Sequence, residues 1–104
     1  MIRVIIERQI AESLEDIYDQ RARSSLRKAV DIPGFISGEA LRGSDNPNHR
    51  VILSTWRSAN HWNRWKNSPE RRDMMAQIRP MRLRARQLYH DREEITCFIE
   101  PDRD

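Results

Sequence analysis

One stretch, residues 49–67 (HRVILSTWRSANHWNRWKN), restricts the possible folds more than any other part of the chain. Residues 50–56 alternate as a β-strand does, and apolar side chains stand on both of its faces, with Val51 and Leu53 on one and Ile52 and Trp56 on the other. In so short a chain, such a strand predicts a sheet covered on both faces, once by its own helices and once by a second copy. We therefore expect a homodimer.

The same stretch passes from strand to helix within about two residues. Ser58 stands where an N-cap accepts a backbone N–H, and Trp62 and Trp65 follow at helical spacing. A second helix start comes at 68–70, where a capping serine, a proline and an acid follow one another, and Met74, Met75 and Ile78 supply its inward side.

The first part of the chain reads as strand, helix, strand. Residues 2–10 alternate as a strand, and a helix begins near Ser13, with acids in its first turns suiting the helix dipole. No histidine joins these acids, so we assign no metal site. The predicted inward stripe of this helix is Leu14, Ile17, Tyr18, Arg21, Ser25, Leu26, Ala29 and Val30. The DIPG segment at 31–34 ends the helix, and residues 35–42 form the next strand.

Turn-forming residues at 43–48 predict an antiparallel hairpin between the strands at 35–42 and 50–56. Pro80 should break or kink the helix before it, and the segment after it fits a helix through Met81, Ala85 and Leu88 or a strand through Met81, Leu83 and Ala85. We favour the helix. Residues 94–99 form the last strand. The order predicts a ferredoxin-like α+β fold, a split βαβ with an antiparallel sheet.

Length and composition predict a single domain, which we place at residues 1–100, with a mobile tail at 101–104. No apolar run approaches the ~20 residues of a membrane span, and the N-terminus lacks the apolar core of a signal peptide. The single cysteine, Cys97, agrees with a reducing compartment. We expect a cytoplasmic protein with no membrane partner.

The positive charge of the chain is concentrated in one segment. Residues 57–92 hold ten Lys or Arg against three acids, a net charge of +7, so the remainder carries −4. This segment could bind a polyanion or form the solvated outer face of helices. We favour the solvated face, because no recognition motif is present and Tyr89 is the only Phe, Tyr or Trp between Arg71 and Arg92. We predict no specific nucleic-acid binding.

Three segments together resemble the antibiotic biosynthesis monooxygenase family: PGFISGEALRG, the turn SDNPN, and VILSTWRSANHWNRWKNSPERR. The resemblance covers residues 2–78. It implies a ferredoxin-like subunit that pairs with its twin as a dimeric α+β barrel, with a pocket in each subunit between the sheet and the helices. It also implies oxidation of a small electron-rich aromatic or quinol-type molecule with no cofactor, because the substrate itself provides the electrons.

Seven residues are candidates for that chemistry. Glu7 could act as a base, Arg8 could pair with an oxyanion, and His61 could assist them as a third catalytic residue. Substrate-binding candidates are Trp56, Asn60, Trp62 and Met75. Each candidate also has a structural interpretation, such as an ion pair between Glu7 and Arg8 within the sheet or across the dimer, or tryptophans that serve as core anchors.

Two alternatives stay open. The heme-degrading branch of the superfamily uses an Asn on the first strand, a Trp at the end of the third and an axial His on a following helix. These places fall on Glu7, Trp56 and Met75, so only the tryptophan remains and heme chemistry is the less favoured hypothesis. The other alternative is a non-catalytic dimer that binds a small molecule or is associated with stress.

Overall fold

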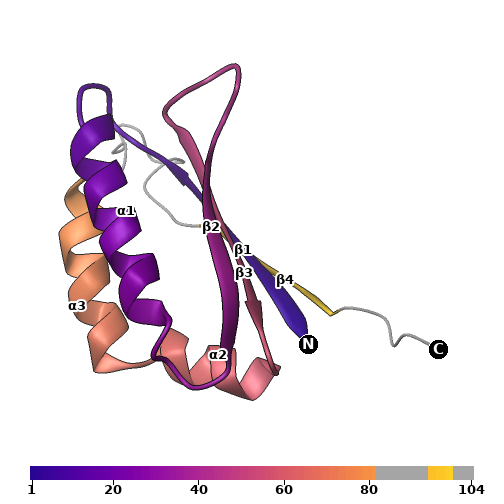
Figure 1. Ribbon diagram of the computed structural model, residues 1–104. Helices are drawn as coiled ribbons and strands as arrows, with labels where there is room; N and C mark the ends of the chain where they lie inside the picture. The colour runs from indigo at the N-terminus through magenta and orange to yellow at the C-terminus, as the bar shows by residue number, and fades with distance from the viewer. Residues whose placement is uncertain (82–93, 100–104) are drawn as a thin grey trace.

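The computed structural model describes residues 1–81 and 94–99. The elements follow in the order β1 (Ile2–Gln9), α1 (Glu15–Ala29), β2 (Phe35–Arg42), β3 (His49–Trp56), α2 (Ala59–Lys66), α3 (Pro69–Ile78), a 3-10 turn (Arg79–Met81) and β4 (Glu94–Ile99). The strands pair antiparallel in the order β2-β3-β1-β4. This arrangement confirms the predicted ferredoxin-like α+β fold (Figure 1).

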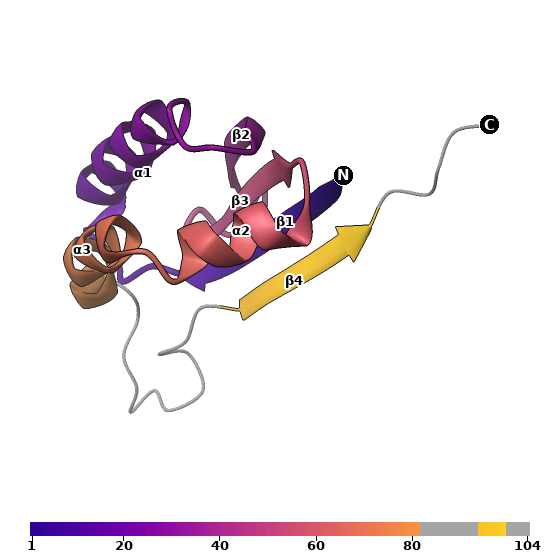
Figure 2. The ribbon, with the colours of Figure 1, turned by 90° about the horizontal axis from the view of Figure 1, so that it is seen from below.

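The sheet has one face covered by helices, since α1, α2 and α3 all lie on the same side of it (Figures 1 and 2). Strand alternation gives that face Ile2, Val4 and Ile6 from β1, which pack with Trp56 and Trp62 in one buried cluster. The register pairs Ile2 with Trp56 and Ile6 with Ile52, so apolar side chains of neighbouring strands lie side by side. The core therefore sits between the sheet and its helices.

The opposite face of the sheet carries the residues between these. On β1 and β3 it presents Ile5, Val51 and Leu53, all half-buried, and on β2 the side chain of Leu41 is 46% exposed. None of the described helices covers this face (Figure 1). Within residues 1–81 and 94–99 this face has no second cover, so the homodimer stays a prediction.

Both predicted serine caps are confirmed. The Ser58 hydroxyl accepts the backbone N–H of His61 at 3.3 Å, and the Ser68 hydroxyl accepts that of Arg71 at 3.1 Å. Each bond satisfies a helix N–H that has no partner within the helix. The break at Pro80 is also confirmed, because α3 ends at Ile78 and a 3-10 turn follows.

Helix α1 differs from its prediction in start and in phase. It begins at Glu15 rather than near Ser13, whose φ of 74° is outside the helical region. Its buried residues are Tyr18, Ala22 and Ala29, whereas Ile17 and Val30 are 45% and 68% exposed. The predicted stripe was too wide, because neighbours of Tyr18 and Ala29 in sequence lie about 100° away around the helix.

Several smaller predictions can be compared with the structure. β1 ends at Gln9, one residue before the predicted end, and β3 begins at His49, one residue before the predicted start. The helix favoured after Pro80 and the tail at 101–104 lie outside the described residues.

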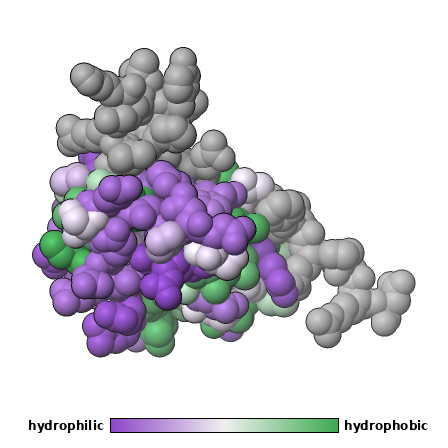
Figure 3. All heavy atoms as spheres, turned by 90° about the horizontal axis from the view of Figure 1, so that it is seen from above, coloured by the Kyte–Doolittle hydropathy of each residue, from purple (hydrophilic) through white to green (hydrophobic). Residues whose placement is uncertain are grey.

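Among the described helices, none is long and apolar enough to cross a membrane. Seen from above, the described surface is mostly hydrophilic with small hydrophobic areas (Figure 3).

Candidate functional site

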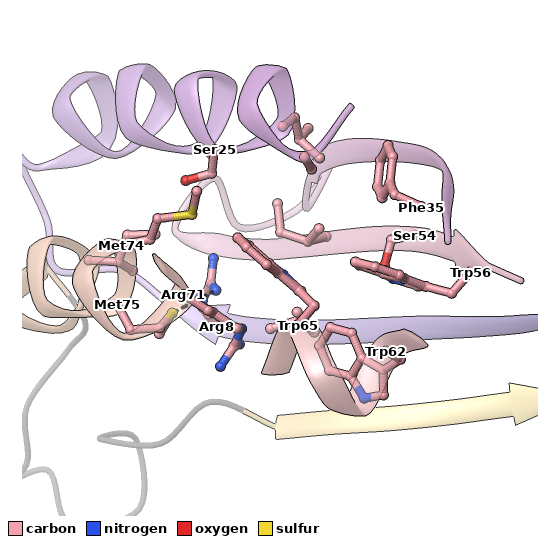
Figure 4. A pocket seen from close by; sticks show the side chains of 16 residues that line it. Arg8, Ser25, Phe35, Ser54, Trp56, Trp62, Trp65, Arg71, Met74 and Met75 are labelled. Atoms are coloured by element: carbon pink, nitrogen blue, oxygen red, sulfur yellow. Dashed lines mark hydrogen bonds between the residues drawn. The ribbon is translucent and has the colours of Figure 1, made fainter. Parts of the chain in front are cut away.

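A cavity of about 70 Å³ lies between the sheet and the helices. Strands supply Arg8, Ser54 and Trp56, and the helices close it with side chains from α1, α2 and α3 (Figure 4). Its large apolar lining residues are Phe35, Trp56, Trp62, Trp65, Met74 and Met75. This is the place, between sheet and helices, where the resemblance implied a pocket.

Three rings form one continuous aromatic wall. Phe35 meets Trp56 edge-on with ring centroids 5.4 Å apart, and the ring centroids of Trp56 and Trp62 are 5.6 Å apart. The indole N–H of Trp56, a residue only 1% exposed, donates to the Ser54 hydroxyl at 3.0 Å. Because that donor is satisfied inside the protein, Trp56 offers the cavity an apolar ring, suited to contact with a flat aromatic ligand.

Two guanidinium groups bring positive charge to this apolar cavity. Arg8 is 6% exposed, and its Nη1 donates to the Tyr18 hydroxyl at 3.0 Å while Nη2 lies 3.5 Å from the Met75 sulfur. The guanidinium carbon of Arg71 lies over the Trp62 ring, 5.7 Å from the ring centroid. Among the described residues that line the cavity there is no carboxylate, so its lining favours an anionic or electron-rich ligand.

Four of the seven sequence candidates line this cavity: Arg8, Trp56, Trp62 and Met75. Glu7 does not, because the residue next to Arg8 on a strand points to the other face of the sheet. There its carboxylate lies 2.9 Å from Nε2 of His49, a residue that no sequence pattern connects with it. The structure therefore places Glu7 outside this pocket, and its position on the other face of the sheet does not support an ion pair with Arg8 within the sheet. The alternative, an ion pair across the dimer, stays a prediction.

Asn60 and His61 also lie outside the cavity lining. Both belong to the first turn of α2, whose buried residues are Trp62 and Trp65. Asn60 is exposed, and Nδ1 of His61 is 2.7 Å from the Ser58 hydroxyl. The His61 ring packs where a side chain at Gly34 would stand, so only glycine fits there, with its φ of 85°. Asn60 and His61 therefore do not face the cavity, because Asn60 is exposed and the His61 ring is directed towards Ser58 and Gly34.

Sequence reasoning missed three residues that shape the site. Trp65 follows Trp62 by three residues and so shares its face of α2, which was a usable signal. Arg71 and Tyr18 gave a weaker signal in the sequence, because an arginine or a tyrosine within a helix has many structural uses. No group of three or more potential metal ligands occurs within residues 1–81 and 94–99.

The sequence model of the family described as antibiotic biosynthesis monooxygenase matches residues 1–77. The chain belongs to this family. Protein SchA of Streptomyces halstedii is 31% identical to this family member over 80 residues, which are 76% of this chain and 21% of SchA. The chain therefore spans about a fifth of the length of that curated relative.

A second match is short. A segment of 19 residues, 18% of this chain, is 95% identical to 5% of a ribosomal RNA large subunit methyltransferase M from Marinobacter nauticus.

Solved structures share the fold of this family member at low sequence identity. A structure from Deinococcus radiodurans, described as a putative antibiotic biosynthesis monooxygenase, has a TM-score of 0.84 at 10% identity, covering 100% of this chain and 96% of that one. SnoaB of Streptomyces nogalater, described as a cofactor-independent oxygenase, has a TM-score of 0.80 at 14% identity, covering 98% and 96%.

Proposed function

We propose that this protein is a cofactor-independent monooxygenase that oxidises a small electron-rich aromatic or quinol-type molecule in the cavity between sheet and helices. The observation that carries the proposal is the buried guanidinium of Arg8 in a cavity walled by aromatic rings. Membership of the family and the fold shared with a cofactor-independent oxygenase support it.

Arg8 has a defined task in this reaction. Its positive charge favours the phenolate form of a bound phenol, whose proton leaves to solvent, because charges interact strongly where water is excluded. The phenolate then gives electrons to O₂, and a C–O bond forms at a hydrogen-bearing ring carbon opposite the phenolate oxygen. The peroxide anion takes up a proton from solvent, and when the resulting hydroperoxide loses water, that carbon loses its hydrogen. One oxygen atom stays as a quinone carbonyl and the other leaves as water.

The size of the cavity limits how the substrate enters. An engineered protein cavity of about 150 Å³ holds benzene, about twice the volume present between the sheet and helices here. A ring therefore enters only if lining side chains move. Met74 and Met75 suit this movement, because an unbranched thioether has three rotatable bonds and repacks at low cost.

Oxygen uptake with hydroquinones, anthrones and polyphenols tests the proposal. We expect uptake that depends on the protein with at least one class, and a decrease in kcat/KM of about 10²-fold in Arg8→Gln. Arg57→Gln is the matched control, because Arg57 is exposed and does not line the cavity. Equal activity of the Arg8→Gln and wild-type proteins would remove Arg8 from the mechanism.

A non-catalytic binding protein is the second candidate function. It is favoured by the lack of a carboxylate or histidine among the described lining residues, which leaves no side chain to act as a general base there. Quenching of tryptophan fluorescence by a member of the same panel, without any oxygen uptake, would establish binding and exclude oxidation of that compound.

We also propose that the protein acts as a homodimer. The support is the half-buried apolar face formed by Ile5, Val51 and Leu53, which no described helix covers. In a domain this small, burial of that face adds substantially to stability.

A further inference from the structure

A second cavity lies beside Tyr18, between α1 and strands β2 and β3. Its volume is about 410 Å³, and its polar lining residues are Tyr18, Asp19, Arg23, Arg42 and Arg50. The remaining lining residues are Ala22, Ala40, Leu41 and Val51. Three guanidinium groups against one carboxylate make the lining positive, and the small side chains of Ala22 and Ala40 provide room for a hydrocarbon group.

Arg50 is the fixed point of this cavity. The residue is 4% exposed, its Nε donates to the Pro47 carbonyl at 2.6 Å, and its Nη1 donates to the Asp19 carboxylate. The guanidinium also stands over the Tyr18 ring, 5.5 Å from its centroid. Two of its three nitrogens are thus held by the protein, which orients the third.

That third nitrogen, Nη2, is buried and has no hydrogen-bond partner within the part of the chain that the structure describes. Leaving a buried donor unsatisfied is costly, and the cost is greater for a charged group. An acceptor bound in the cavity would form a hydrogen bond with Nη2 and so remove this free-energy cost. A guanidinium matches the geometry of a carboxylate or phosphate better than that of other acceptors.

We infer that the second cavity binds a small organic carboxylate. Nη2 of Arg50 donates to the carboxylate, Arg23 on α1 and Arg42 on β2 contribute charge at the exposed rim, and the apolar body of the ligand lies against Ala22 on α1 and Ala40 on β2. An organic anion is favoured over an inorganic one because four of the nine lining residues are apolar. The inference does not depend on oxidation in the first cavity, where Arg8 and the tryptophans lie.

Three probes of similar size or charge test this inference: benzoate, its neutral analogue benzamide, and inorganic phosphate. Each is titrated into the labelled protein, and NMR follows the Arg50 Nε–H signal and the methyl signals of Ala22 and Ala40. We expect benzoate to shift these signals, and benzamide to bind at least about tenfold more weakly, since it lacks the charge. Phosphate should also bind more weakly than benzoate.

Variants at the rim separate this site from general attraction to a basic protein. Arg23→Gln combined with Arg42→Gln should weaken benzoate binding by about tenfold, and both positions are exposed, so folding is preserved. The matched control combines Arg57→Gln, just before α2, with Arg64→Gln on α2. It removes the same amount of charge away from the second cavity and should leave benzoate binding unchanged. No shift at Arg50, equal loss in both double variants, or tighter binding of phosphate than of benzoate would each overturn the inference.

Discussion

Glu15 organises the junction between the first strand and the first helix. Its Oε1 accepts the backbone N–H of Ser13 at 3.1 Å and the side-chain amide of Asn48 at 3.0 Å. The N-cap residue of α1, Leu14, has no side chain that can do this. The pKa of Glu15 is lowered from its usual 4.5, first by its own backbone N–H, then by Asn48 and by Ser13. The charged form is thus the one that the fold stabilises.

Glu15→Gln should therefore destabilise the protein in a pH-dependent way. A carboxyl group whose pKa is lowered by folding contributes stability above its unfolded pKa, near 4.5, and loses it as the pH falls through the folded value. Urea unfolding should show wild type more stable than the variant at about pH 7, with the difference shrinking towards about pH 3. Glu12→Gln, at an exposed carboxylate of the same loop, is the control. A difference that is constant with pH would contradict this assignment.

At the level of elements, one serine joins the two short helices that close the cavity. The Ser68 hydroxyl donates to the Trp65 carbonyl at 2.7 Å, near the end of α2, and accepts the Arg71 N–H at the start of α3. Trp65 and Arg71 both line the cavity. The turn between the helices therefore positions two walls of the site at once.

Ser68→Ala should lower the free energy of unfolding by about 1 kcal/mol, the usual cost of losing an N-cap. Chemical denaturation measures this, and fluorescence of the cavity tryptophans should change as Trp65 shifts. Ser44→Ala, in the exposed turn between β2 and β3, should stay within about 0.5 kcal/mol of wild type. Similar effects of the two substitutions would show that the Ser68 cap contributes nothing special.

On the scale of the whole molecule, the sheet has one face packed under helices and one face without a described cover. Burial of a Leu or Ile side chain contributes about 1.5 to 3 kcal/mol, so pairing of two such faces contributes enough to hold a dimer. This face includes Ile5 and Leu53, directly opposite each other on β1 and β3.

Sedimentation at micromolar concentration should find the mass of two chains, and Leu53→Lys should give one chain, because the new charge would be buried at the interface. Ile17→Lys is the control. Ile17 is 45% exposed on α1, on the helical side of the molecule, and the same change there should leave the dimer intact. A wild-type protein that sediments as a monomer would contradict the proposed dimer.

Sequence reasoning succeeded where the signal is local. The period of two in β1 and β3, the serine caps at Ser58 and Ser68 and the break at Pro80 each depend on neighbours within a few residues, and all are confirmed. Element order then restricted the topology to the ferredoxin-like sheet. Even the opposite directions of Glu7 and Arg8 follow from strand alternation, although the sequence analysis did not apply it to them.

The tertiary structure alone decided which distant residues meet. Arg8 contacts Tyr18, and Arg50 pairs with Asp19, because α1 docks on the sheet with a particular rotation about its axis. His49 reaches Glu7 across 42 positions because of the register of β1 with β3. Periodicity shows which side of a helix or strand is apolar, but rotation and register are set by how side chains from separate elements fill the core together. For that reason the sequence by itself determined most of the described elements, their order and two rings of the aromatic wall, Trp56 and Trp62, whereas packing determined the place of Phe35 in that wall and the charged partners that complete both cavities.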